Sequence, residues 1–292
     1  MSSNRLFKLI GYKAIYLTFC KRFNKNPIPL NIPIFGKIKT YHEIINIHDN
    51  FAVGELRDEV VEAHLSQEKK PVVVDCGINV GITVRWWLNG FSNKNLQVIG
   101  IDMIDETHKF TINSLIESNI NPERYRYHVA ALWKHGNKTF DVNVEDPLYG
   151  QTNVFSIGEA KNIRTINSKT MDDLLSSSSL KKIDLIKIDI EGAGANALAG
   201  ALESLKITRH VIIELHNEEE QAESSKILLE NGFYLRKSSG KHLWWERTSF
   251  TPPATRSRAR THGQSGRPHR HLGHTRVGRV ESRETRSRSC RS

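Results

Sequence analysis

The stretch FYLRKSSGKHLWWE at residues 233–246 decides between two kinds of α/β fold. Its segments 233–237 and 242–246 read as strands, and only residues 238–241 separate them. Parallel neighbours would need a long crossover, so two strands joined by so short a turn must pair antiparallel. A helix predicted at 219–231 stops just before them at Asn231-Gly232, a pair that commonly ends helices. The sequence therefore predicts a sheet that finishes with an antiparallel hairpin.

Upstream of this hairpin, short apolar runs alternate with helical patterns. The runs read as strands at 72–74, 97–101, 126–130, 183–188 and 210–214, and the helical patterns lie near 82–89, 106–118 and 195–205. Such alternation indicates a parallel sheet covered by helices on both faces. With the hairpin, this gives a Rossmann-like α/β fold with a mostly parallel, seven-stranded sheet. A nicotinamide-binding Rossmann domain would normally finish with a parallel strand, so the hairpin argues against that class.

The main α/β domain is predicted to span residues 70–248. Within it, residues 137–170 interrupt the alternation with two strand-like runs and a polar stretch. An insertion at this point would lie over the C-terminal edge of the sheet, where such folds bind ligands. We therefore expect residues 137–170 to include a lid over the substrate.

Residues 1–69 are predicted to form a helical and extended appendage. They contain a helix at 1–25, one or two strands within 38–47, and a helix at 54–67. The apolar part of the first helix is too short and too charged to span a bilayer. This helix either packs on the main domain or lies on a membrane surface as a basic amphipathic helix, making a peripheral contact.

The formal net charge of +10 is unevenly distributed. Residues 251–292 hold eleven arginines and two glutamates, so residues 1–250 are nearly neutral. The region 249–292 is rich in Arg, Ser and His and poor in apolar residues, which predicts a disordered tail. A nucleic-acid partner is not expected, because residues 251–292 lack aromatic residues for base stacking. Three cysteines without a CxxC pair indicate neither a disulfide framework nor a zinc site, and they fit a reducing, cytoplasmic setting.

The first strand of the domain runs directly into DCGINVG at residues 75–81. Glycines at such a turn allow the backbone to approach a ligand closely. Gly77 and Gly81 stand four residues apart, so the GxGxxG spacing of dinucleotide binders is absent. The acid Asp75 would repel a pyrophosphate but could pair with a positively charged amino group. The turn therefore favours a cationic nucleoside over a dinucleotide.

The second strand ends at Asp102, about 20 residues beyond the glycine turn. A carboxylate at this position can accept hydrogen bonds from both hydroxyls of a ribose. The alternative role is to cap the following helix, but Asp105 is equally well placed for that. We expect Asp102 to hold a ribose.

The fourth strand ends at Asp189-Ile190-Glu191-Gly192, and the fifth ends at Glu214-Leu215-His216. Two carboxylates two residues apart on an extended segment face the same side. They could act as a general base or help to hold a divalent cation, or they could simply cap a helix. A histidine beside a carboxylate is a candidate general base near neutral pH, and a purely structural histidine is the alternative.

These segments together resemble the pattern of the FkbM methyltransferase family. The segments are DCGINVG, GIDMID at 100–105, TMDDLL at 170–175, IDLIKIDIEGAG at 183–194 and VIIELH at 211–216, and they cover about residues 70–247. The resemblance implies a class I methyltransferase fold that uses S-adenosyl-L-methionine. It also implies that the methyl group goes to a hydroxyl oxygen of a small molecule or glycan acceptor.

The resemblance also implies roles for individual residues. Asp75, Gly77, Asn79 and Gly81 would line the cofactor, Asp102 would hold its ribose, and Asp189, Glu191 and His216 would face the reacting centre, with Asp189 or His216 as the proton acceptor. Where the family usually has an acid two residues after the DxEG glycine, this chain has Gly194. A catalytically impaired nucleoside-binding relic of the fold and an NAD-dependent oxidoreductase stay open as alternatives, and so does a divalent metal.

Overall fold

The computed structural model describes residues 2–52, 56–144, 146–148 and 162–249. All of them belong to one compact unit. Nearly all of the predicted disordered tail (249–292) lies outside the described residues, as does the segment 149–161 of the predicted lid. In the part of the chain that is described, no helix has the length and hydrophobicity needed to cross a membrane.

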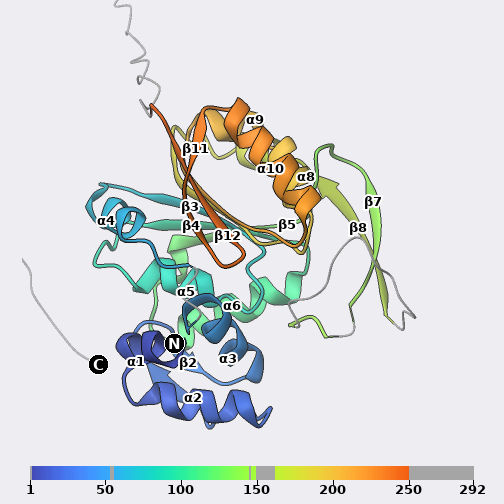
Figure 1. Ribbon diagram of the computed structural model, residues 1–292. Helices are drawn as coiled ribbons and strands as arrows, with labels where there is room; N and C mark the ends of the chain where they lie inside the picture. Colours follow the sequence, from blue (N-terminus) through green and yellow to red (C-terminus); the bar gives the residue numbers. More distant parts are fainter. Residues whose placement is uncertain (1, 53–55, 145, 149–161, 250–292) are drawn as a thin grey trace, which may run out of the picture. The chain divides into compact units, whose positions relative to one another are not determined.

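A seven-stranded sheet forms the centre of this unit, in the order β11-β12-β10-β9-β3-β4-β5 (Figure 1). The parallel strands are β3 (Val72–Cys76), β4 (Gln97–Asp102), β5 (Tyr125–Val129), β9 (Ile183–Ile188) and β10 (Thr208–Glu214). The strand β12 (His242–Arg247) pairs antiparallel with both β10 and β11 (Phe233–Ser239). The predicted mostly parallel sheet with a terminal antiparallel hairpin is therefore confirmed.

Helices cover both faces of the sheet. They include α5 (Ile82–Asn89), α6 (Asp105–Glu117), α7 (Met171–Ser176), α8 (Gly194–Ala199), α9 (Leu202–Lys206) and α10 (Glu218–Glu230). Neighbouring residues of β3 enter different cores: Val73 packs with residues of α5 and α6, whereas Val74 packs with residues of α8, α9 and α10. This alternation follows from the two-residue period of a strand and explains why every residue of β3 is apolar or buried.

The predicted helix at 195–205 is interrupted and forms α8 and α9. A Cβ atom at Gly200 would lie 2.4 Å from the carbonyl oxygen of Trp133, so only glycine fits against that backbone. Gly200 ends α8, and α9 begins two residues later.

The N-terminal region packs into the same core as one face of the sheet. Its elements are α1 (Ser2–Ile10), α2 (Lys13–Arg22), β1 (Leu30–Ile32), β2 (Gly36–Ile38), α3 (Tyr41–Ile47), the π-helical turn η1 (His48–Ala52) and α4 (Glu59–Gln67). The single helix predicted at 1–25 is divided into α1 and α2 at Gly11, which has a φ of +62°. Leu6 and Leu17 are fully buried in the shared core.

The prediction of strands across 38–47 is wrong beyond Ile38, because Tyr41–Ile47 is helical. Thr40 and Glu43 form a capping box, in which the Thr40 hydroxyl accepts from the Glu43 amide and the Glu43 carboxylate accepts from the Thr40 amide. Arg85 on α5 also donates to Glu43 at 2.6 Å, and both side chains are fully buried. The cap and this ion pair outweigh the strand preference of the isoleucines in the segment.

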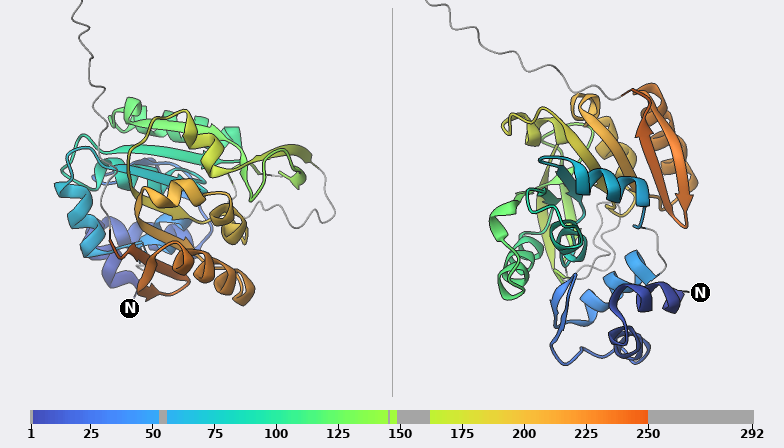
Figure 2. Two further views of the ribbon diagram at one scale, coloured as in Figure 1. Left: turned by 90° about the horizontal axis from the view of Figure 1, so that it is seen from above. Right: turned by 90° about the vertical axis from the view of Figure 1, so that its left-hand side faces the viewer.

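Two short strands and one longer strand form a small separate sheet in the order β6-β8-β7. They are β6 (Ala131–Leu132), β7 (Thr139–Asn143) and β8 (Ile163–Lys169). The β7–β8 pair projects away from the central sheet, as both figures show (Figures 1 and 2). A 3₁₀ turn at Pro122–Arg124 precedes β5.

Candidate active site

A cavity of about 550 Å³ opens where the parallel strands of the sheet end. Four successive segments contribute residues to it: Gly77 and Asn79 follow β3, Asp102 ends β4, Asp189 and Glu191 follow β9, and Glu214 and His216 come from the end of β10. Six of the eight site residues predicted from the sequence therefore line one cavity. The carboxyl edge of a parallel sheet is where α/β folds bind their ligands, because the connecting loops converge there.

The opposite wall of the cavity comes from α3 and η1. It includes Tyr41, His42, Ile45, Asn46, Asp49 and Asn50. No sequence pattern predicted this wall, because the segment lies before the alternating strands and helices. The buried Arg85–Glu43 ion pair holds α3 against α5 and so fixes the position of the wall.

The glycine turn approaches the DxEG segment very closely. Gly77 has a φ of +79°, and a Cβ atom there would lie 1.7 Å from the carbonyl oxygen of Asp189. Asn79 also has a positive φ, of +48°, and its side-chain oxygen is buried without a hydrogen-bond partner among the described residues. An unpaired buried acceptor is costly, so Asn79 Oδ1 is a candidate contact for a ligand that donates a hydrogen bond.

Asp75 and Gly81 are the two predicted cofactor residues that do not line the cavity. The Asp75 side chain is fully buried; it accepts a hydrogen bond from Trp87 Nε1 at 3.0 Å and pairs with Lys187 Nζ at 3.3 Å. Its charge is thus already compensated, and it is not placed to meet the amino group of a ligand directly. Gly81 instead begins α5 in the left-handed conformation, packed against Thr111.

Lys187 is a buried cation beneath the cavity floor. Its ammonium donates to the carbonyl oxygen of Gly77 at 2.7 Å and lies 3.2 Å from Asp189 Oδ2. It therefore joins the glycine turn to the DxEG segment. A lysine in the strand IDLIKI, whose other residues except Asp184 are apolar, was the sequence signal for a buried ion pair, because lysine is almost never fully buried unless it is paired.

Asp102 is held by its own backbone surroundings and still faces the cavity. Its carboxylate accepts from the amide of Ile104 at 3.0 Å and from that of Asn79 at 3.2 Å. Burial raises the pKa of Asp102 to about 6, although both amides favour the charged form. Each carboxylate oxygen keeps a lone pair for a further donor such as a ribose hydroxyl.

Asp189 and Glu214 share a hydrogen bond across the ends of β9 and β10. Burial and the neighbouring charge of Asp189 raise the pKa of Glu214 to about 8. Burial also opposes ionisation of Asp189, but the Lys187 ammonium outweighs it and lowers the pKa of Asp189. At neutral pH the pair therefore holds one proton, on Glu214, and one negative charge, on Asp189.

His216 lies between two carboxylates. Its Nε2 atom is 3.4 Å from Glu191 and its Nδ1 atom is 3.5 Å from Glu220. The Gly192 amide donates a hydrogen bond to His216 Nδ1 at 3.1 Å, which disfavours a proton on that atom. Hydrogen bonds to Glu191 and Glu220 nevertheless raise the pKa of His216 to about 10. The two carboxylates therefore favour the protonated imidazole, which would be a charged partner for Glu191.

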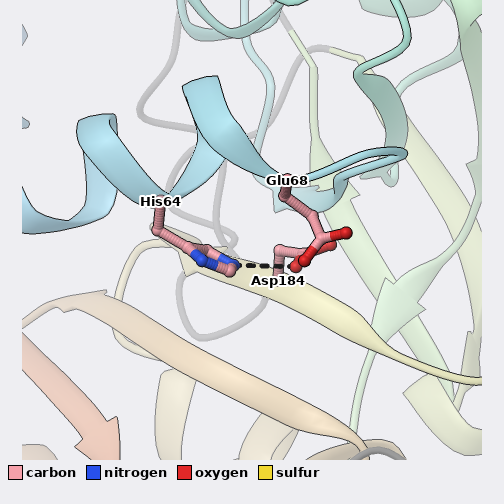
Figure 3. Close-up of side chains that lie close together, drawn as sticks. All are labelled: His64, Glu68 and Asp184. Carbon is pink, nitrogen blue, oxygen red and sulfur yellow. Dashed lines mark hydrogen bonds and ion pairs between the residues drawn. The ribbon is translucent and has the colours of Figure 1, made fainter.

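Two groups of side chains in the described residues have the composition of a metal site. Asp189, Glu214 and His216 place ligand atoms within 4.8 Å of one another, and a metal bound there would have to displace the proton that Glu191 and Glu220 favour on His216. In the second group, His64 Nε2 lies 2.8 Å from Asp184 Oδ1 beside Glu68 (Figure 3). Lys182 already pairs with Glu68 at 2.8 Å and with Asp184 at 3.1 Å, so an ammonium occupies the place of a cation.

Residues 42–237 match the family model of the methyltransferase FkbM domain. Among solved structures, the chain is similar to the methyltransferase FkbM from Methylobacillus flagellatus (17% identity, TM-score 0.42), a similarity that covers 70% of this chain and 53% of that one. The chain thus spans about half the length of that structure. No curated protein matches the chain.

Two further solved structures are similar at lower identity. One is fibrillarin from Aeropyrum pernix in complex with S-adenosyl-L-methionine (8% identity, TM-score 0.39, covering 66% of this chain and 76% of that one). The other is precorrin-6y C5,15-methyltransferase from Geobacter metallireducens (8% identity, TM-score 0.38, covering 64% and 83%).

Proposed function

This chain belongs to the FkbM methyltransferase family, and we propose that it transfers a methyl group from S-adenosyl-L-methionine to a hydroxyl oxygen. The observation that carries the proposal is the convergence of the glycine turn, Asp102 and the Asp189–Glu214 pair on a single cavity. Its volume of about 550 Å³ lies within the range typical of small-molecule sites.

The charges along the cavity suit a cationic nucleoside. Asp49, Asp102, Asp189 and Glu191 line it, beside Glu214, which burial and Asp189 keep in its protonated form at neutral pH. S-adenosyl-L-methionine carries an ammonium and a sulfonium, whereas the pyrophosphate of NAD would meet several carboxylates. This arrangement favours the methyl donor over the dinucleotide cofactor.

The cofactor contacts follow from the geometry of the turn. Asp102 has the position and the remaining lone pairs to accept from the ribose hydroxyls. Asn79 Oδ1, buried without a partner among the described residues, suits a donor such as the ammonium of the cofactor. Asp75 contributes indirectly, because it holds Lys187, which in turn holds the carbonyl oxygen of Gly77.

When it is bound, the cofactor supplies a methyl group on a sulfonium, which is a good leaving group. The protein must then orient the acceptor hydroxyl and take its proton. We assign Asp189 as the base that accepts the proton of the acceptor hydroxyl, because Asp189 is the ionised member of its pair with Glu214. An alcohol oxygen becomes strongly acidic as it gains the methyl carbon, so a carboxylate of low pKa is a sufficient base. His216 and Glu191 form the ion pair that borders the acceptor side.

The acceptor class, a sugar, glycan or other hydroxylated small molecule, follows from the family alone. A screen of methyl transfer from labelled S-adenosyl-L-methionine to such compounds tests it. Asp189→Asn should abolish turnover with less than a twofold change in cofactor affinity, whereas Asp102→Ala should weaken that affinity at least tenfold. Calorimetry with S-adenosyl-L-methionine, S-adenosylhomocysteine and NAD separates the alternatives. Binding of NAD alone, or of none of the three, would refute the proposal.

A further inference from the structure

The helix α2 is apolar on two opposite faces. Ala14, Leu17 and Cys20 point into the core. On the opposite side, Tyr12, Ile15, Phe19 and Phe23 form a stripe at the helical spacing i, i+3, i+7 and i+11. The stripe side chains are 76%, 68%, 51% and 52% exposed, in that order. A helix that packs on a domain needs only one apolar face, so the four exposed residues of the outer stripe indicate a binding surface.

The charges that residues 1–42 contribute to this surface are all of one sign, and the acid Asp49 pairs with one of them, Lys21. Residues 1–42 contain eight lysines and arginines and neither aspartate nor glutamate. Lys8, Arg22 and Lys25 are exposed beside the stripe or close to it in the sequence. Arg22 follows Ile15 by seven residues and therefore lies on the same side of α2. The expected partner is thus both apolar and negatively charged.

A second copy of this chain does not fit these charges. In a two-fold symmetric dimer the same patch would face itself, so the exposed basic side chains of Lys8, Arg22 and Lys25 on one copy would be brought towards those on the other. A membrane with anionic lipids offers the matching chemistry, because aromatic and aliphatic side chains enter the boundary between headgroups and acyl chains while Lys and Arg meet the phosphates. Tyrosine is especially suited to this boundary, since one end of its side chain is apolar and the other polar.

We propose that the Tyr12–Phe23 stripe is a docking surface for an anionic phospholipid membrane. The contact is peripheral: α2 has ten residues and lies on the bilayer with only its outer face inserted. The inner face keeps its place in the core, so docking requires no unfolding.

The cavity wall is directly connected to this helix. The hydroxyl of Tyr41, which lines the cavity, donates to Asn24 Oδ1 at 2.6 Å, just beyond the end of α2. Lys21 on α2 also pairs with Asp49 of the same wall at 2.8 Å. Docking through α2 therefore holds this wall of the cavity close to the membrane surface.

Vesicle sedimentation with the full-length protein tests the proposal. The vesicles are pure phosphatidylcholine, or phosphatidylcholine with about 30% phosphatidylglycerol to supply negative charge. The double variant Ile15→Asp/Phe19→Asp removes the centre of the stripe. The matched control is Ile116→Asp/Leu229→Asp, which alters exposed apolar residues on α6 and α10. The arginine-rich residues 251–292 are the same in all three proteins, so their contribution cancels.

We expect the wild-type protein and the control to bind the anionic vesicles with affinities that agree within twofold. The stripe variant should bind at least tenfold more weakly, with an unchanged circular dichroism spectrum. Equal binding by the stripe variant and the control would overturn the proposal. So would equal wild-type binding to neutral and anionic vesicles. A wild-type dimer that the stripe variant converts to a monomer, with no vesicle binding, would assign the surface to self-association instead.

Discussion

Lys187 Nζ lies 3.2 Å from Asp189 Oδ2 and 3.3 Å from Asp75 Oδ1, and only 1% of the Lys187 side chain is exposed. The Lys187 ammonium thus pairs both with Asp75, which lies outside the cavity, and with Asp189, which lines it. Through the 2.7 Å hydrogen bond to Gly77 O, it also fixes the glycine turn.

Replacement of Lys187 by methionine should strongly destabilise the protein. It would leave Asp75 without its cation in a fully buried position, and removal of one partner of a buried ion pair costs about 3–5 kcal/mol. Urea unfolding at pH 7 measures the loss. The double variant Lys187→Met/Asp75→Asn should recover much of it, because it removes the orphaned charge as well. Equal stability of the single variant and the wild type would contradict the ion-pair assignment.

The raised pKa of Glu214 predicts a pH-dependent stability. Its folded-state pKa of about 8 lies above its ordinary value of 4.5, so protonation of Glu214 stabilises the fold. This contribution is complete below pH 4.5 and is lost as the pH rises towards and through 8, for a total on the order of a few kcal/mol. Glu214→Gln mimics the protonated group and should lack this loss. Urea unfolding of both proteins between pH 5 and 9 compares the slopes, and parallel curves would rule out a raised pKa.

Gly194 leaves room for the carboxylate of Glu220. The Gly194 amide donates to Glu220 Oε1 at 2.8 Å, and a Cβ atom at residue 194 would lie 2.8 Å from both that oxygen and Ile213 Cδ1. Gly194→Asp, which restores the acid usual in the family, should therefore displace Glu220 and weaken its hold on His216. We expect about 1–3 kcal/mol of destabilisation from overpacking and a lower kcat with unchanged cofactor affinity.

A matched variant separates crowding from charge at this position. Gly194→Ala adds the Cβ atom without the carboxylate, so it should reproduce the destabilisation but only part of the loss in kcat. If Gly194→Asp has full activity and full stability, then Glu220 is not needed where the structure places it.

Methyl transfer should not require a divalent cation. Lys187 already pairs with Asp189, and a metal on the His216 ring would have to displace the proton that Glu191 and Glu220 favour there. Turnover should therefore change by less than twofold when a chelator such as EDTA is added. Loss of activity with EDTA and recovery with magnesium would instead assign a cation to Asp189, Glu214 and His216.

The sequence predicted those features that depend on local pattern. The hairpin at 233–246, the parallel strands and the glycine turn all follow from residue periodicity and turn chemistry, and each is within a few residues of its predicted place. The helix at Tyr41–Ile47 was missed because its capping box competes with strand-forming isoleucines, and the pattern alone did not decide between them.

Contacts between distant parts of the chain could not be predicted. Asp75 was expected to meet the cofactor, but it is engaged by Lys187, more than a hundred residues later in the sequence, and by Trp87. The charge state of His216 likewise depends on Glu220, whose side chain reaches it only because residue 194 has no side chain. Neither relationship leaves a periodic signal.

The two walls of the cavity come from different segments of the sequence, because α3 and η1 supply one of them. The carboxylates and the glycine turn belong to the sheet edge, whereas the facing wall belongs to a segment that the buried Arg85–Glu43 pair attaches from outside. If the proposed acceptor lies against this wall, exchange of wall residues such as Asn46 would alter which acceptor is admitted, while the groups proposed for chemistry and for the methyl donor keep their positions. Under the proposed function, acceptor preference could then change while the residues of the reaction centre stay the same.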